Sequence, residues 1–244
     1  MARCSNWETN EPWLRRFFAE GRWSWPILIC CPNPSPATKC IPASHFILLA
    51  GIGFSSAIFY RGKPFHIKPA TVSVLMSPLH NPQGYGIAIA TTALTALLLI
   101  RTVLFSYQRL RRKGPKLALI GAVMSAFGLT ALLAIAALSP FTRIDSWPHI
   151  ILAHTALIGI CAGIFCHLVA ARATLLPLLA HCGFLVVLLY LYASWRFFAN
   201  HTLLTSLTSL ECVFCLDCAV GFWALAKLLE RHWKEAKVEV SKRP

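Results

Sequence analysis

The sequence predicts an all-α fold, a polytopic membrane protein folded as a six-transmembrane-helix bundle. Three observations predict it: the composition, six long apolar runs, and the clustering of basic residues between those runs. Of the 244 residues, 57% are hydrophobic and 13% are charged, with a mean hydropathy of +0.61. A soluble domain carries about 25% charged residues, so this chain lacks the polar surface that water requires.

Six runs have the length and composition of membrane spans, at about 44–60, 85–107, 117–138, 148–170, 174–198 and 204–228. About 20 apolar residues in a helix cross the hydrocarbon layer, and the first run is the shortest of the six. Helices are expected because lipid offers no partner to unpaired backbone groups. The turn 171–173 is so short that the fourth and fifth spans are expected to form an antiparallel hairpin.

The runs divide the chain into three parts. Residues 1–43 are expected to be a partly disordered N-terminal tail, residues 44–230 the six-helix transmembrane domain, and residues 231–244 a basic C-terminal tail. Acylation of Cys30 and Cys31 in the first tail is left open.

Basic residues predict the orientation of the spans. The formal net charge is +14, which in a soluble protein would suggest nucleic acid, but here Lys and Arg lie between the apolar runs. With the chain starting inside, 16 of them fall on the cytoplasmic side and four on the other. The positive-inside rule therefore predicts cytoplasmic N- and C-termini, and no nucleic-acid partner is expected.

Carboxylates inside a span are costly, so Glu211 and Asp217 are the first candidates for a functional site. Glu211 is expected near the exoplasmic interface and Asp217 deeper, about 120° away around the helix. His154 is a third polar candidate within a span. The functional interpretation is a proton, cation or lipid-headgroup site. The alternative is that each residue is bonded to a neighbouring helix.

Two patterns in the spans could indicate a cofactor site. The run Cys212, Cys215 and Cys218 has a spacing of three, but a straight helix spreads its sulfurs over about 9 Å, too far for one metal ion. We expect these cysteines to be packing residues and predict no metal site. His154 and His167 point about 140° apart on an ideal helix, which is poor geometry for two haems. No cofactor and no catalytic residue is therefore predicted, and a haem-binding redox protein remains only the second alternative.

Two further patterns concern packing and lipid contact. Small residues recur along one side of two spans and would let helix backbones approach closely: Gly121, Ser125, Gly128, Gly159 and Gly163. We expect packing within the chain, with dimerisation as the alternative. A basic run between the second and third spans is either a lipid-headgroup site or a determinant of topology: Arg109, Arg111, Arg112, Lys113 and Lys116.

Several short motifs then suggest a family. One protein family has similar elements in the same order. In this chain they are the loop element Pro69-Ala-Thr-Val-Ser73 with the later Pro82, Ser125 to Thr130 in the third span, His154 in the fourth and Glu211 at the start of the last. The chain resembles the Frag/DRAM/Sfk superfamily over about residues 44–236. That group includes the damage-regulated autophagy modulators, the Golgi proteins of GPI-anchor lipid remodelling and the Sfk-type proteins linked to phosphoinositide kinase.

The resemblance implies six spans and cytoplasmic termini, and it has departures. The loop lacks the acidic residue and glycine that often follow the family's serine and has Leu75 and Met76 instead. Ala134-Ile135-Ala136 replaces a polar pair near the end of the third span, and the N-terminal tail is longer than usual.

The leading hypothesis is a non-enzymatic regulator or scaffold in membrane trafficking, autophagy or lipid signalling, located in the lysosome, the Golgi or the plasma membrane. Its expected partners are membrane lipids, including anionic lipids at the cytoplasmic face, and other membrane proteins. The first alternative is lipid handling, as in GPI-anchor lipid remodelling or lipid transport, in which Glu211, Asp217 and His154 would share one cavity.

Overall fold

The structure is a computed structural model, and it describes residues 34–61, 71–111, 113–143, 146–197 and 207–241. The chain divides into two units, Met1–Pro32 and Asn33–Pro244, and all that follows concerns the second. The predicted tail, including Cys30 and Cys31, falls largely outside the described residues, as do Pro69 and Arg112.

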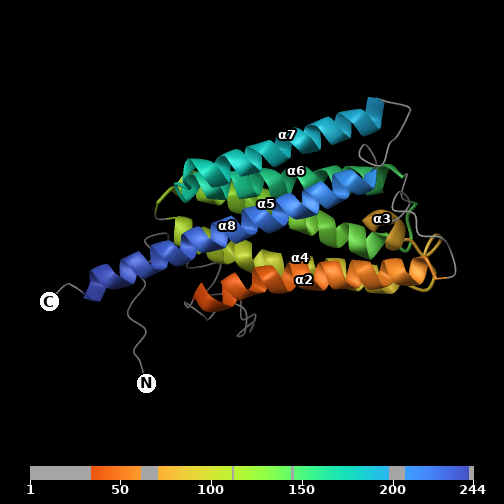
Figure 1. The fold of residues 1–244 in the computed structure, drawn as a ribbon, viewed down its shortest axis with the longest axis horizontal. Coiled ribbons are helices and arrows are strands. Elements are labelled where there is room, and N and C mark those ends of the chain that lie inside the picture. The colour runs from red at the N-terminus through yellow and green to blue at the C-terminus, as the bar shows by residue number, and fades with distance from the viewer. Residues whose placement is uncertain (1–33, 62–70, 112, 144–145, 198–206, 242–244) are drawn as a thin grey trace, which may run out of the picture. The chain divides into compact units, whose positions relative to one another are not determined.

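Within the described residues, six long helices carry the predicted spans, and a short seventh lies in the loop after the first. Their bounds are α2 Pro34–Phe59, α3 Val72–Leu75, α4 Tyr85–Leu110, α5 Pro115–Leu138, α6 Trp147–Ala170, α7 Leu175–Phe197 and α8 Leu207–Ser241 (Figure 1). Each long helix is long and apolar enough to cross a membrane, and the described residues contain no strand. The predicted fold class, an all-α six-span membrane protein, is confirmed.

Two helices extend beyond the predicted runs by more than one full turn. α2 begins at Pro34, before the predicted start at 44, because prolines in a first turn lack only an N–H that would be unpaired anyway. α8 continues to Ser241, beyond the predicted end of the sixth run. Its apolar span ends at Arg231, and the helix continues beyond this span through the residues that follow. Lys227 and Glu230, one turn apart, form an ion pair of 3.9 Å near that end.

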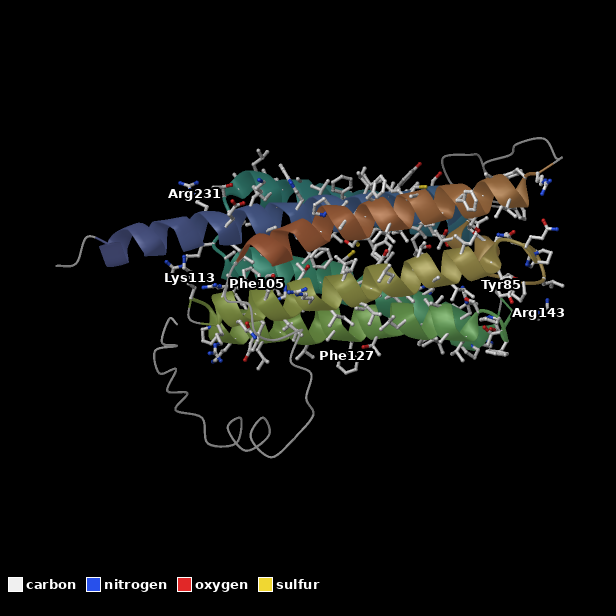
Figure 2. All side chains as sticks on the ribbon, turned by 90° about the horizontal axis from the view of Figure 1, so that it is seen from below. Tyr85, Phe105, Lys113, Phe127, Arg143 and Arg231 are labelled. Atoms are coloured by element: carbon white, nitrogen blue, oxygen red, sulfur yellow. The ribbon has the colours of Figure 1, made fainter. Side chains whose placement is uncertain are left out.

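Successive long helices run in opposite directions, so one end of the bundle carries α3 and the starts of α4, α6 and α8 (Figure 1). We call this the α3 end and the other the C-terminal end. α5 packs along α6 and α2 along α4, and α8 contacts α2, α6 and α7. Lys113 and Arg231 lie at the C-terminal end, and Tyr85 and Arg143 at the α3 end (Figure 2).

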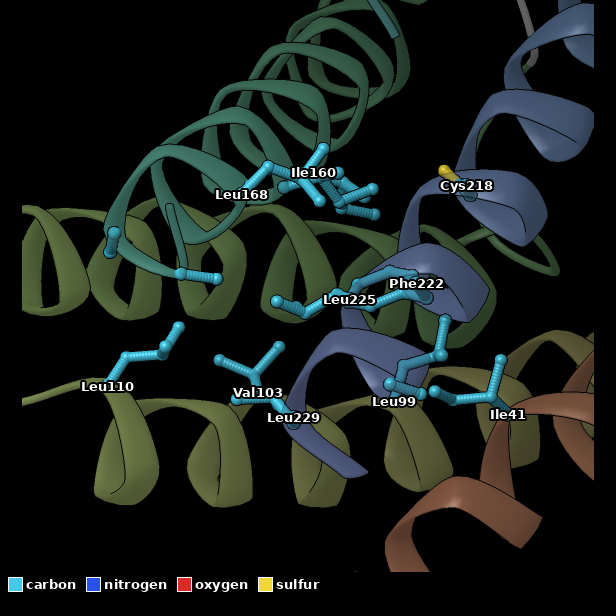
Figure 3. Packing of buried hydrophobic residues seen from close by; sticks show 14 of the residues in the cluster. Ile41, Leu99, Val103, Leu110, Ile160, Leu168, Cys218, Phe222, Leu225 and Leu229 are labelled. Atoms are coloured by element: carbon cyan, nitrogen blue, oxygen red, sulfur yellow. The ribbon is translucent and has the colours of Figure 1, made fainter. Parts of the chain in front are cut away.

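The main core forms where α8 crosses the other helices. Phe222 and Leu225 of α8 are fully buried, and Ile160 and Leu168 of α6 pack in the same cluster (Figure 3). Leu99 of α4 and Ile41 from α2 close this cluster from the other side. Large apolar side chains face outward over much of the remaining surface, as expected of a protein whose solvent is lipid.

Candidate functional site

Glu211 anchors the loop after the first span to the last span. Its carboxylate accepts hydrogen bonds from the Val72 backbone N–H at 2.5 Å and from Ser73 Oγ at 3.1 Å. Val72 and Ser73 open α3, whose first N–H groups have no partner within the helix. A carboxyl group suits that position, because its two oxygens accept from the backbone N–H and from the serine hydroxyl at once.

His149 extends this contact to a third element. Its Nε2 lies 3.2 Å from Ser73 Oγ, and His149 is buried at the start of α6. The hydrogen of the serine goes to Glu211, so His149 Nε2 must donate to the serine oxygen rather than take its proton. The arrangement therefore joins α6, α3 and α8 in one chain of hydrogen bonds. It differs from a catalytic triad, in which the histidine is the base for the serine.

The rest of the same loop is held by Asn81. Its Nδ2 donates to Ser55 Oγ at 2.9 Å and to the Leu75 carbonyl at 3.1 Å, while its Oδ1 accepts from the Gly84 N–H at 3.1 Å. Pro82, a residue of the predicted loop motif, is exposed beside it. Asn81 was not predicted, because an asparagine in a loop gives no sign of which helix it will reach.

Asp217 is the centre of a second polar contact, deep in the bundle. Its Oδ1 lies 2.7 Å from His181 Nδ1 on α7, and its Oδ2 accepts from Cys161 Sγ of α6 at 3.5 Å. The exposed fractions of Asp217 and His181 are 0% and 2%. Three helices thus meet at one carboxylate that neither water nor lipid reaches.

The partners of His181 determine how many protons this contact holds. His181 Nε2 lies 3.0 Å from the Cys161 carbonyl oxygen, which can only accept, so Nε2 carries a hydrogen. The bond from Nδ1 to Asp217 holds one more proton, placed on either residue. The pair is therefore neutral as a unit, either as His⁺ with Asp⁻ or with both groups uncharged. Such a pair avoids the cost of an isolated buried charge.

His154 belongs to a third contact, with α7. Its Nδ1 lies 2.7 Å from the Ile150 carbonyl and therefore donates to it. Its Nε2 lies 3.1 Å from the Tyr192 hydroxyl and accepts that hydrogen. The two rings also pack edge to face with their centroids 5.4 Å apart.

Each of the three predicted polar residues thus has partners of its own. Glu211 binds α3, Asp217 binds His181 and Cys161, and His154 binds Tyr192. The lipid-handling alternative requires one cavity that all three residues share, and these contacts do not support such a cavity. Sequence reasoning did not identify His149 as a partner of Ser73, nor His181 as the partner of Asp217. A histidine and a carboxylate in different spans were the only available signal for the second pair.

The histidines and cysteines have the following positions. Both ring nitrogens of His154 and of His181 are engaged by protein groups, so neither ring offers a nitrogen to haem iron without breaking a bond. His167 is fully buried against Gly121. Cys212 is exposed on α8, whereas Cys218 lies in the main core, so the two side chains have different surroundings. Among the described residues, no group of three or more His, Cys, Asp or Glu side chains has the geometry to hold a metal ion.

The five predicted small residues all lie between α5 and α6. A Cβ at Gly159 would stand 2.8 Å from the Gly128 backbone, and a Cβ at Gly163 would stand 2.0 Å from Ser125 Oγ. A Cβ at Gly121 would meet Gly163 O at 3.1 Å. These residues let the two helices touch backbone to backbone within one chain, so this face is already covered.

The described part of the predicted basic run lies at the C-terminal end. Lys113 and Lys116 are exposed, and Figure 2 shows Lys113 near the end of the bundle at which α8 leaves it. The Arg109 guanidinium lies 5.4 Å from the centroid of the Phe105 ring. This end therefore presents positive charge beside the apolar span, where lipid headgroups are located.

Comparisons of the chain with protein-family models, with curated proteins and with solved structures gave no match.

Proposed function

We propose that this chain is a non-enzymatic six-span membrane protein that acts as a regulator or scaffold in membrane trafficking, autophagy or lipid signalling. The resemblance to the Frag/DRAM/Sfk superfamily supplies these processes. The proposal is supported by a contact between two of the residues that carry the resemblance, because Ser73 donates a hydrogen bond to Glu211, 138 residues further along the chain.

The observation that carries the proposal is the Glu211 anchor. The carboxylate is occupied by the Val72 N–H and Ser73 hydroxyl, which are fixed groups of the chain. A catalytic carboxylate would need to face a substrate. A carboxylate that holds a loop against a helix end instead shapes a surface, which is what a scaffold offers to its partners.

The orientation is part of the proposal. The C-terminal end, which carries Lys113, Lys116 and Arg231, would face the cytoplasm, where anionic lipids are concentrated. The α3 end, with the Glu211 anchor, would then face the lumen or the outside. A partner on that side would meet the loop that Glu211 and Asn81 hold in place.

The experiment follows the full chain, tagged at its C-terminus, in living cells against lysosome, Golgi and plasma-membrane markers. Glu211→Gln should disturb the loop and so change localisation or autophagic flux, whereas Cys212→Ser, at the neighbouring exposed position, should change neither. Purified protein is tested in parallel for conversion of labelled membrane lipids. Turnover that Glu211→Gln abolishes would contradict a non-enzymatic role.

A further inference from the structure

A cavity of about 850 Å³ lies between α5, α6 and α7, apart from the contacts of Glu211 and Asp217. This volume falls within the range of about 300–1,000 Å³ that is usual for small-molecule sites. Most of its wall is one face of α6, and its lining residues are Met124, Phe127, Trp147, Ile150, Ile151, His154, Thr155, Ile158, Gly159 and Tyr192. Phe127 is 64% exposed on the outside of the bundle (Figure 2), so the cavity opens toward lipid.

The charges of the lining residues restrict the ligand. The lining contains no Lys, Arg, Asp or Glu. An ionised headgroup would lose its hydration here without gaining a counter-charge, which is costly in an apolar environment. The cavity therefore suits an uncharged molecule.

The hydrogen bonds of the inner wall restrict it further. Thr155 Oγ1 donates its hydrogen to the Ile151 carbonyl at 2.8 Å. The hydrogens of His154 Nδ1 and of the Tyr192 hydroxyl are committed to Ile150 O and to His154 Nε2. On this inner wall the donors of His154, Thr155 and Tyr192 are therefore used, and Thr155 keeps an acceptor oxygen; the indole N–H of Trp147 lies at the far end of the lining. A ligand with a hydroxyl to donate fits the inner wall, which offers no donor to an ester carbonyl at that depth.

The dimensions agree with a rigid lipid. Along α6 the lining runs from Trp147 to Gly159, which corresponds to about 18 Å of helix. Along the axis of α6, Thr155 lies about 12 Å from Trp147, so it is within the apolar wall and not at the Trp147 end of the cavity. We propose that this cavity is a binding site for a sterol, with the hydroxyl of the sterol donating to Thr155 Oγ1 and its rings against Phe127 and Ile151. The proposal goes beyond the proposed function and does not depend on it.

The test uses the purified full chain in nanodiscs and a photoreactive sterol, with labelled peptides mapped by mass spectrometry. Labels should fall on α6 between 147 and 159. Ile158→Trp, which fills the cavity, should reduce labelling at least fivefold. Val186→Trp, at a similarly exposed position of α7 that does not line the cavity, should leave it unchanged. Elution profiles and melting curves show whether both variants are folded.

A second variant tests the hydroxyl contact. Thr155→Val keeps the side-chain shape and removes the acceptor, so unlabelled sterol should compete about 2- to 10-fold more weakly, the loss of one hydrogen bond. A sterol methyl ether, which has no hydrogen to donate, should compete equally with both proteins. The proposal is overturned if the two tryptophan variants lose labelling equally, if the label maps to other helices, or if phosphatidylcholine competes as well as sterol.

Discussion

A close backbone contact between α5 and α6 yields the sharpest prediction. Gly159 of α6 meets Gly128 of α5, and a Cβ at position 159 would stand 2.7 Å from Met124 O and 2.8 Å from the Gly128 Cα and N atoms. All three are backbone atoms, so no side-chain rotation relieves the clash. Gly159→Ala therefore requires the two helices themselves to move apart.

The size of the effect follows from these distances. Ordinary contact begins at 3.4 Å and the nearest atom, Met124 O, would lie at 2.7 Å, so α5 and α6 must separate by about 0.7 Å at this contact. Overpacking of this kind costs typically about 1–3 kcal/mol. At 2–4 °C for each kcal/mol in a chain of this size, Gly159→Ala should lower the melting temperature by roughly 2–12 °C.

The assay is thermal unfolding of the full chain in one detergent, followed by the loss of the monodisperse elution peak. Gly183→Ala on α7 is the matched control, because a Cβ there meets nothing within 4 Å. Alanine is the better helix former, so the control should be as stable as the parent or more stable. Equal melting temperatures for Gly159→Ala and the parent would refute the close contact of α5 and α6.

Three further predictions concern the polar contacts. Asp217→Ala should lower stability by about 1–3 kcal/mol, since it leaves His181 Nδ1 and the Cys161 thiol buried without their partner; Asp217→Asn should retain most of that stability, because an amide can donate to a neutral Nδ1. Melting temperatures compare the two, and an alanine variant as stable as the parent contradicts the buried pair. Ser73→Ala should cost about 1 kcal/mol and speed limited proteolysis of the loop before α4, whereas Gln83→Ala at an exposed site of the same loop should not; unchanged cleavage in both would argue against the Glu211 anchor. Tyr192→Phe should lower the melting temperature by a few degrees through the loss of one hydrogen bond, while Tyr190→Phe, which is 64% exposed, should have no effect; matching melting curves would argue against the bond to His154.

The sequence by itself determined the number of spans and the helical class. Both follow from local quantities, because a run of apolar residues must form a helix in lipid whatever its neighbours are. The ends of the helices were harder to predict from the sequence. α2 begins at Pro34 and α8 continues to Ser241, because helix formation extends beyond the apolar run that hydropathy detects.

Only the tertiary structure decided which polar residues meet. Glu211 and Asp217 were visible in the sequence as costly intramembrane carboxylates, but their partners, Ser73 and His181, lie far away along the chain. Pairing depends on the rotation and tilt of each helix, which come from the packing of all six. The Gly159 contact with Gly128 shows the same limit. A row of small residues on a helix indicates that another helix packs closely against it, but only the fold shows which helix that is.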